Sequence, residues 1–353
     1  LNLLREDLQT WREVEYARAQ RLHLAGTWRP NRRTEMRVDF ERGIQDRVMG
    51  RRFPGLDLVT PYLAAGAPTY DRALSGNTYP AGISALATTP RLVFENETGA
   101  WANWQRYGVG TPPPTTAVMT TAARLPFAAV LAGPASTSDN AMVTATAAVQ
   151  VEVIRDLFVE LALNESATRR WVNTPVDWTN QGLRIDPNLT APLGAPRPGQ
   201  YYVESSARHD YNTGDHHNRR LLATYEWTTG HPWFGTHRLV GLVSQAIAES
   251  RGRFWLETNL TPLNPAVPAL TAPQNLLYRR TYLSRAGVFG DNGRRFFDQN
   301  PFAGSAAPAP FGDPANGLSG TITPGWVLNS DTPTRHDNRA LMQIGRASCR
   351  ERV

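Results

Sequence analysis

Alternation of apolar and polar residues with a period of two is the strongest pattern in the chain. Within residues 35–41, three apolar side chains alternate with four charged ones: Met36, Val38 and Phe40 with Glu35, Arg37, Asp39 and Glu41. The same alternation runs through residues 21–28, and the turn-forming segment 29–33 joins the two stretches. A period of two predicts a strand with one apolar face and one polar face. The sequence therefore predicts a β-hairpin with strands of about ten residues.

The pattern recurs along most of the chain. Further alternating stretches cover residues 149–153, 157–164, 221–228 and 239–246, with weaker candidates at 201–211 and 276–285. Residues 1–16 suit either a helix or a strand, and no other segment favours a long amphipathic helix. We therefore predict an all-β fold with antiparallel sheets.

The connections between these strands are very unequal in length. Short turns close the hairpins, whereas four long segments rich in Pro, Gly, Ala, Thr and Asn separate them: Ile44–Ala148, Glu165–Gln200, Arg251–Gln274 and Ala286–Arg335. Compact soluble domains seldom carry structureless loops this long. Short turns on the periplasmic side and long extracellular loops on the other are typical of transmembrane β-barrels. Aromatic residues beside the short turns suit a membrane-interface girdle, although ordinary packing would also explain them: Trp28, Tyr225, Trp227, Trp233 and Phe234.

Composition excludes several classes of protein. With 41% hydrophobic and 19% charged residues among 353, the chain has enough apolar material to fold. No apolar run approaches the ~18 residues of a membrane-spanning helix. The 37 basic residues are all Arg and exceed the 31 acidic ones by 37 − 31 = 6, but only residues 29–33 form a basic patch, so the sequence does not predict nucleic-acid binding.

The last eleven residues differ in character from the rest. Residues 343–353 contain the only cysteine, Cys349, and resemble the translation of a short-read sequencing adapter. We expect residues 1–342 to be the natural segment and 343–353 to be an artefact, a natural basic tail being the alternative. Without the tail the chain has no cysteine, which excludes thiol catalysis, cysteine-based zinc sites and disulfides within this segment.

Three hairpin segments resemble those in the barrels of TonB-dependent outer-membrane receptors. They are residues 21–30 with the charged strand that follows, residues 156–164, and residues 220–227 continuing through a turn to 235–239. The resemblance is diffuse and extends over most of residues 16–342. It covers barrel strands only, so we expect a fragment without the plug domain and TonB box of that family.

The resemblance implies a function in uptake across the cell outer membrane. The expected ligand is an iron chelate, a cobalamin-like compound or an oligosaccharide, and the expected partners are outer-membrane lipid and TonB, the latter through the plug. Six charged residues on polar strand faces are expected to face the barrel lumen: Arg37, Asp39, Glu41, Glu152, Glu160 and Glu226. The alternatives are a secreted soluble all-β carbohydrate-binding protein or enzyme, and a passive porin or adhesin.

Aromatic and arginine residues in the long loops are the best candidates for ligand contact. Flat rings stack on sugars or chelates and guanidinium groups pair with anions, so we expect ligand binding by Trp101, Trp104, Tyr107, Arg169, Arg170, Trp171 and Trp178. The same aromatics could instead anchor the loops. No catalytic motif is present, so we expect no enzyme and no cofactor. His216 and His217 are adjacent and would point to opposite faces of a strand, so no metal site is predicted.

Overall fold

The computed structural model describes most of the chain. The described residues are 1–12, 14–48, 56–57, 59–69, 83–85, 91–104, 107–109, 130, 132–176, 182–192, 194–228, 236–283, 300–303, 307–313 and 317–348. No helix in this described part is long and apolar enough to cross a bilayer.

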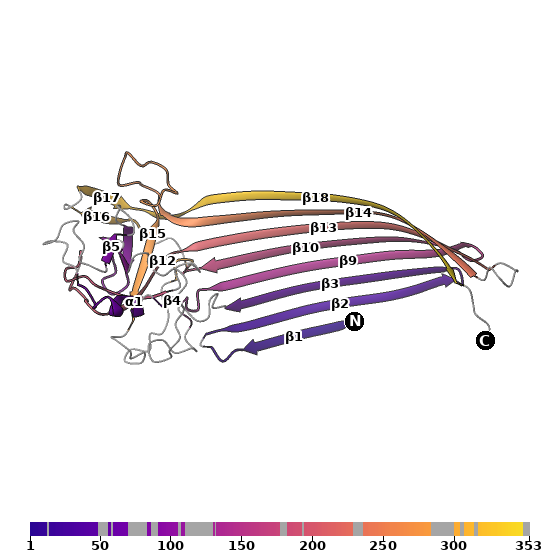
Figure 1. Cartoon of the computed structure of the whole chain (residues 1–353), viewed down its shortest axis with the longest axis horizontal. Helices are drawn as coiled ribbons and strands as arrows, with labels where there is room; N and C mark the ends of the chain where they lie inside the picture. The colour runs from indigo at the N-terminus through magenta and orange to yellow at the C-terminus, as the bar shows by residue number, and fades with distance from the viewer. Residues whose placement is uncertain are drawn as a thin grey trace.

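An eight-stranded antiparallel sheet dominates the molecule (Figure 1). Its strand order is β1-β2-β3-β9-β10-β13-β14-β18, so every neighbouring pair is consecutive among these strands. The strands are β1 (Asn2–Gln9), β2 (Tyr16–Asn31), β3 (Thr34–Val48), β9 (Thr137–Ile154), β10 (Leu157–Thr174), β13 (Arg208–Thr228), β14 (Thr236–Asn259) and β18 (Pro324–Ser348). We call this the long sheet; it confirms the predicted all-β, antiparallel character, but the described strands form no closed barrel, since β1 and β18 lie at its two edges.

Local chemistry explains the short turns at one end of the long sheet. Between β2 and β3, the side chain of Asn31 accepts a 2.8 Å hydrogen bond from the backbone N–H of Arg33. Between β9 and β10, Asp156 adopts a φ of 65°, a conformation that Asp tolerates better than most residues. Both turns fall where the sequence predicts them.

The strands are longer than predicted. The sequence indicates about ten residues, whereas β13, β14 and β18 have 21, 24 and 25. Each strand continues beyond its alternating stretch. It does so because the neighbouring strand supplies backbone hydrogen bonds there, even where the side-chain alternation fades. Residues 2–9, which also suited a helix, form strand β1 for the same reason: all eight pair with β2.

Parts of the expected loops fold into a second sheet at the other end of the long strands, together with strands in the two weaker strand candidates, 201–211 and 276–285 (Figure 1). This small sheet has the order β4-β11-β12-β15-β6-β7, with β4 (Leu56–Asp57), β11 (Gly182–Ile185), β12 (Tyr201–Ser206), β15 (Leu277–Tyr282), β6 (Arg91–Glu95) and β7 (Ala100–Trp104). The pairs β4–β11 and β6–β15 are parallel, so the antiparallel prediction is wrong for this sheet. Beside it lie helix α1 (Val59–Ala64) and two hairpin-like pairs, β5 (Ile83–Ala85) with β8 (Tyr107–Val109) and β16 (Ala309–Asp313) with β17 (Leu318–Ile322).

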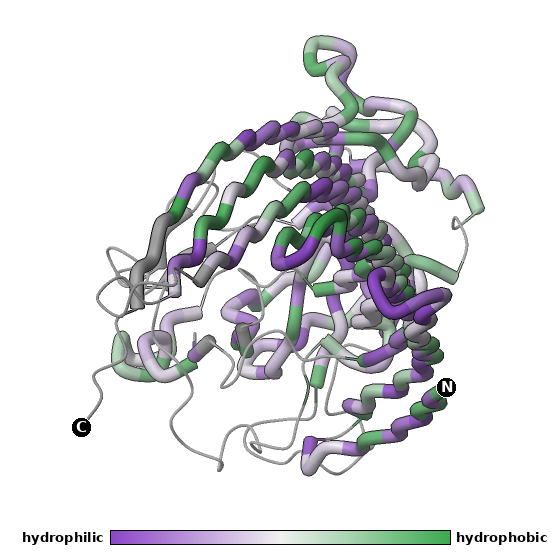
Figure 2. The backbone as a smooth tube through the Cα atoms, turned by 90° about the vertical axis from the view of Figure 1, so that its right-hand side faces the viewer, coloured by the Kyte–Doolittle hydropathy of each residue, from purple (hydrophilic) through white to green (hydrophobic). Residues whose placement is uncertain are grey.

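The apolar cores of the described residues lie in and around the small sheet. One core is centred on Val59, Leu183 and Val203, a second on Leu92 and Leu277, and a third on Val93 and Trp104. The long sheet contributes almost none of their members, and Figure 2 shows hydropathy alternating along its strands. The long sheet is therefore held together by its hydrogen-bonded ladders and not by packing against another layer.

We expect Gly325→Ala at the start of β18 to destabilise the fold. A Cβ there would lie 2.5 Å from Cδ1 and 2.7 Å from Cγ of Leu260, so the joint between β18 and the segment after β14 must shift. Overpacking of this kind costs about 1–3 kcal/mol. Urea denaturation in detergent measures the effect, with Gly241→Ala as control because a Cβ at Gly241 meets nothing within 4 Å. Equal stability of the two variants would contradict this account of the joint.

Candidate functional site

One face of the long sheet carries an uncovered band of apolar side chains, which we call the outer face. Leu161 of β10 stands opposite Leu221 of β13, and Leu221 stands opposite Val243 of β14. These three side chains are 48%, 46% and 51% exposed. The band continues on the other side of β10 through Val149 and Met36, the successive partners of Leu161 on β9 and β3.

The border of this apolar band runs diagonally across the strands. On β13 it ends before Arg219, which stands opposite Leu163 of β10. On β3 it ends before Arg42, which lies at the level of Ala167 on β10 through their common partner Val143. The border thus shifts by roughly four residues over three strand steps, which corresponds to a strand tilt of roughly 40° at ordinary strand spacing and rise. Strands of transmembrane barrels are tilted by a similar angle.

Aromatic side chains mark the end of the band next to the short turns. Tyr225 and Trp227 of β13 stack with ring centroids 5.6 Å apart, and Trp227 stacks on His237 at 5.0 Å. Trp28 of β2 is 63% exposed on the same outer face, opposite Met36. Trp233 and Phe234, also expected in this girdle, lie outside the described residues.

The opposite, inner face of the long sheet is polar and laced with ion pairs. Glu160 of β10 bridges Arg37 of β3 at 2.6 Å and Arg220 of β13 at 2.5 Å. By register all six predicted lumen residues lie on this face, Glu152 among them. Besides Glu160 and Arg37, three of them form ion pairs: Asp39 with His23 at 2.7 Å, Glu41 with Arg21 at 3.9 Å, and Glu226 with Arg238 at 3.2 Å. That this face borders a lumen remains a prediction.

The predicted ligand-contacting aromatics of the small sheet are packing side chains. Trp101 and Trp104 of β7 are 7% and 4% exposed and belong to two of the apolar cores. Tyr107 lies in β8, away from them in the sheet order. Ligand contact by these residues stays a prediction that the buried rings do not favour.

The other predicted ligand residues divide between the two faces of the long sheet. Arg169 and Trp171 of β10 point to the outer face, where Trp171 stacks on Tyr211 with centroids 4.0 Å apart. Arg170 points to the inner face and donates to Ser138 Oγ at 3.4 Å. Trp178 lies outside the described residues. The structure therefore does not gather the predicted set into one site.

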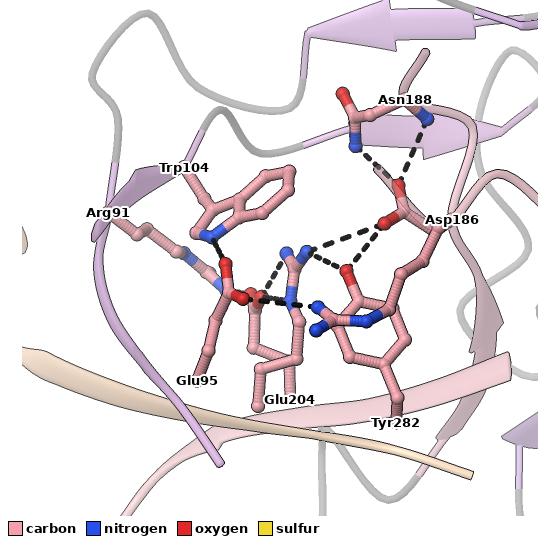
Figure 3. Close-up of polar contacts among 9 residues, drawn as sticks. Arg91, Glu95, Trp104, Asp186, Asn188, Glu204 and Tyr282 are labelled. Carbon is pink, nitrogen blue, oxygen red and sulfur yellow. Dashed lines mark hydrogen bonds and ion pairs between the residues drawn. The ribbon is translucent and has the colours of Figure 1, made fainter. Parts of the chain in front are cut away.

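A buried network of charged and aromatic side chains holds the small sheet together (Figure 3). Its centre is Arg280 of β15, which is 2% exposed and is paired in register with Glu204 of β12. The Arg280 guanidinium donates to Glu204 Oε2 at 2.5 and 2.9 Å and to the Tyr282 hydroxyl at 3.1 Å. Two aromatic rings pack against the Arg280 guanidinium, whose central carbon lies 4.2 Å from the ring centroids of both Trp104 and Tyr202.

Further contacts extend this network to β6, β7 and the segment after β11. Arg91 of β6 reaches the other oxygen of Glu204 at 3.2 Å, and Trp104 donates to Glu95 at 2.6 Å. The Tyr282 hydroxyl donates to Asp186 at 2.5 Å, and Asp186 also accepts from Asn188 (Figure 3). A second buried pair, Arg279 with Glu257, ties β15 to the end of β14 in the long sheet.

The electrostatics of the network depend on compensation between buried charges. Burial alone raises the pKa of Glu204, but Arg280, Arg91 and Arg184 together lower it to about 2. Burial raises the pKa of Glu95, although Arg280, Trp104 and Arg197 act in the opposite direction. Burial would lower the pKa of Arg280, yet Glu204 and its other neighbours hold it well above the usual value. The Arg280–Glu204 pair is therefore ionised at neutral pH and serves to position the loops.

Sequence reasoning missed these residues because it treated their segments as loops or weak strands. The signal was present in residues 277–282, where Arg279 and Arg280 interrupt an otherwise uncharged strand. No cue in the sequence pairs Arg280 with Glu204, because the two lie 76 residues apart. Metal binding has no support in the described part of the chain, where no group of three His, Cys, Asp or Glu side chains could hold an ion.

We expect Arg280→Met to unfold the small sheet selectively. The substitution leaves Glu204 buried without its main partner, and breaking a buried pair in this way costs about 3–5 kcal/mol. Limited proteolysis should then cut the segments of the small sheet while the long strands stay protected. Arg155→Met is the matched control, since the Arg155 side chain is 92% exposed; similar protection in both variants would refute the role of Arg280.

The lowered pKa of Glu204 predicts how stability changes with pH. A carboxyl group whose folded-state pKa lies below its unfolded value of about 4.3 adds stability above that value and loses it as pH falls. With a folded pKa of about 2, the contribution should be complete above pH 5 and disappear between roughly pH 4.5 and 2. Urea midpoints across this range should fall more steeply for the natural chain than for Glu204→Gln.

Comparisons with known proteins give only distant matches. No family model and no curated protein matches the sequence. Among solved structures, the ferric preacinetobactin receptor BauA from Acinetobacter baumannii shares 8% identity at a TM-score of 0.38, with 98% of this chain and 38% of that one covered. The RagAB peptide importer in its open-open state shares 10% identity at a TM-score of 0.32, with 94% of this chain and 25% of that one covered. In its closed-closed state it shares 11% identity at a TM-score of 0.33, with 96% of this chain and 27% of that one covered. This chain therefore spans less than two fifths of each of these structures, and similarity at this level does not establish a family for it.

Proposed function

We propose that this chain is part of a transmembrane β-barrel transporter of the cell outer membrane. The observation that carries the proposal is the uncovered apolar band on the outer face of the long sheet. Soluble monomers seldom expose an apolar patch larger than a few hundred Å². A bilayer would cover this band, and the aromatic residues beside the short turns suit its interface.

The polar inner face supports the same proposal. Residues there alternate with those of the apolar band, which is the pattern of a barrel with lipid outside and a polar lumen inside. The ion pairs of Glu160 with Arg37 and Arg220 would line that lumen. A secreted soluble β-protein, in contrast, would need a second protein layer over the apolar band.

The finer assignments follow from the resemblance to TonB-dependent receptors and belong to the proposal. They are active uptake of an iron chelate, a cobalamin-like compound or an oligosaccharide, coupling to TonB through a plug domain, and no enzymatic activity. The folded small sheet supports a binding role for the loops, because its buried network would hold any ligand-contacting loop in a fixed position.

The tail also forms part of the proposal. That residues 343–353 are an artefact rests on their sequence, which resembles a translated sequencing adapter.

Membrane insertion can be tested with one pair of neighbouring substitutions. Leu161→Arg places a charge in the apolar band, where it should weaken association with phosphatidylcholine vesicles by about 2–4 kcal/mol. Ala162→Arg places the same charge on the inner face and should have little effect. Vesicle flotation of both variants measures the difference, and equal loss of association, or none in either variant, would refute the proposal.

A further inference from the structure

The inner face of the long sheet contains a hollow near the small sheet. Its volume is about 440 Å³. Five of its lining residues form one row across five strands, as successive register partners: Gly43, Met142, Thr168, Gly214 and Ser250. Their position in the register puts them on the same face as Glu160 and Arg37.

Two glycines in the floor of this hollow lie close under neighbouring side chains. A Cβ at Gly214 would lie 2.9 Å from Thr168 Oγ1, and a Cβ at Gly43 would lie 3.3 Å from Met142. Neither position has room for a larger residue without movement of its neighbour. Around this floor stand side chains that can donate hydrogen bonds, among them Asn140, Asn212 and Arg170.

One arginine without an ion-pair partner lines this hollow, and a second lies beside it. Arg170 is the lining residue, whereas Arg47 is outside the lining, two strands away on the same face, with Ser138 of β9 between them. Within the described ranges neither guanidinium has an ion-pair partner, and Nε of Arg47 is buried without any hydrogen-bond acceptor. Burial and the positive charge of Arg170 both lower the pKa of Arg47, as expected for two cations held close together.

Two carboxylates on this face have arginine partners of their own. Glu41 faces Arg21 at 3.9 Å, and Asp210 pairs with Arg208 through Oδ1, while its Oδ2 is buried without a hydrogen-bond partner. Arg21, Arg47, Arg170 and Arg208 therefore outnumber the two carboxylates in this region of the inner face. Hydrogen bonds from guanidinium groups to anionic oxygens are among the strongest in proteins, so an anion would satisfy Arg47 and Arg170 together.

We propose that the hollow is a binding subsite for a carboxylate or phosphate group, and that the transported ligand is anionic. This inference rests on the proposed function in so far as the inner face borders the transport path. A neutral oligosaccharide would leave the two arginines uncompensated, so the subsite favours a ligand that bears acidic groups, such as a carboxylate-bearing chelate.

The test is binding of citrate and of pyrophosphate to the full chain refolded in detergent, measured by calorimetry. Arg170→Gln and Arg47→Gln should each weaken binding by about tenfold or more, the effect of losing one charge-assisted hydrogen bond. Arg155→Gln is the matched control, because Arg155 lies in the turn between β9 and β10, is not a lining residue of the hollow, and has a side chain that is 92% exposed. Preference for citrate would identify a carboxylate site, and preference for pyrophosphate a phosphate site.

Absence of binding to the natural chain at millimolar anion would overturn the proposal, as would an equal loss in Arg155→Gln. Misfolding should not obscure the result, because removing one of two neighbouring cations relieves repulsion, and Arg170→Lys, which keeps the charge, should retain part of the binding. Failure of vesicle flotation with intact anion binding would instead overturn the membrane assignment and leave the subsite standing.

Discussion

The pleat of the long sheet, which sends successive side chains to opposite faces, is the constraint on which the rest of this structure depends. Because apolar residues occupy alternate positions on the neighbouring strands β2, β3, β9, β10, β13 and β14, their side chains merge into one continuous band. Nothing in the described part of the chain packs over that band. Tilting the strands makes its diagonal border level, which suits the proposed bilayer.

The small sheet is stabilised in a different way. Its strands are short and come from segments far apart in the chain, so hydrogen-bonded ladders alone would hold it weakly. Apolar cores and the buried pair of Arg280 with Glu204 supply the remaining contacts. Buried ion pairs are weak evidence for net stability, but they disfavour alternative arrangements, because a displaced strand would leave a charge buried without a partner. The network thus specifies how the loops are arranged.

Charge pairing differs between the two ends of the inner face of the long sheet. Near the short turns, Glu160 pairs with Arg37 and Arg220. Near the small sheet, Arg47 and Arg170 have no ion-pair partner in the described segments. Under the proposed function, an anion entering from the loop side would meet these two arginines before it meets the paired charges.

The sequence by itself determined the all-β class, the hairpin turns at Arg33 and Asp156, and the face on which residues of the alternating stretches lie, because a period of two is a local property of the backbone. It could not determine strand length, since β13, β14 and β18 extend through backbone pairing that requires no side-chain pattern. Nor could it reveal the small sheet, the pair of Arg280 with Glu204, or the approach of Arg47 to Arg170. Those depend on which distant segments become neighbours, and only the tertiary structure decides that.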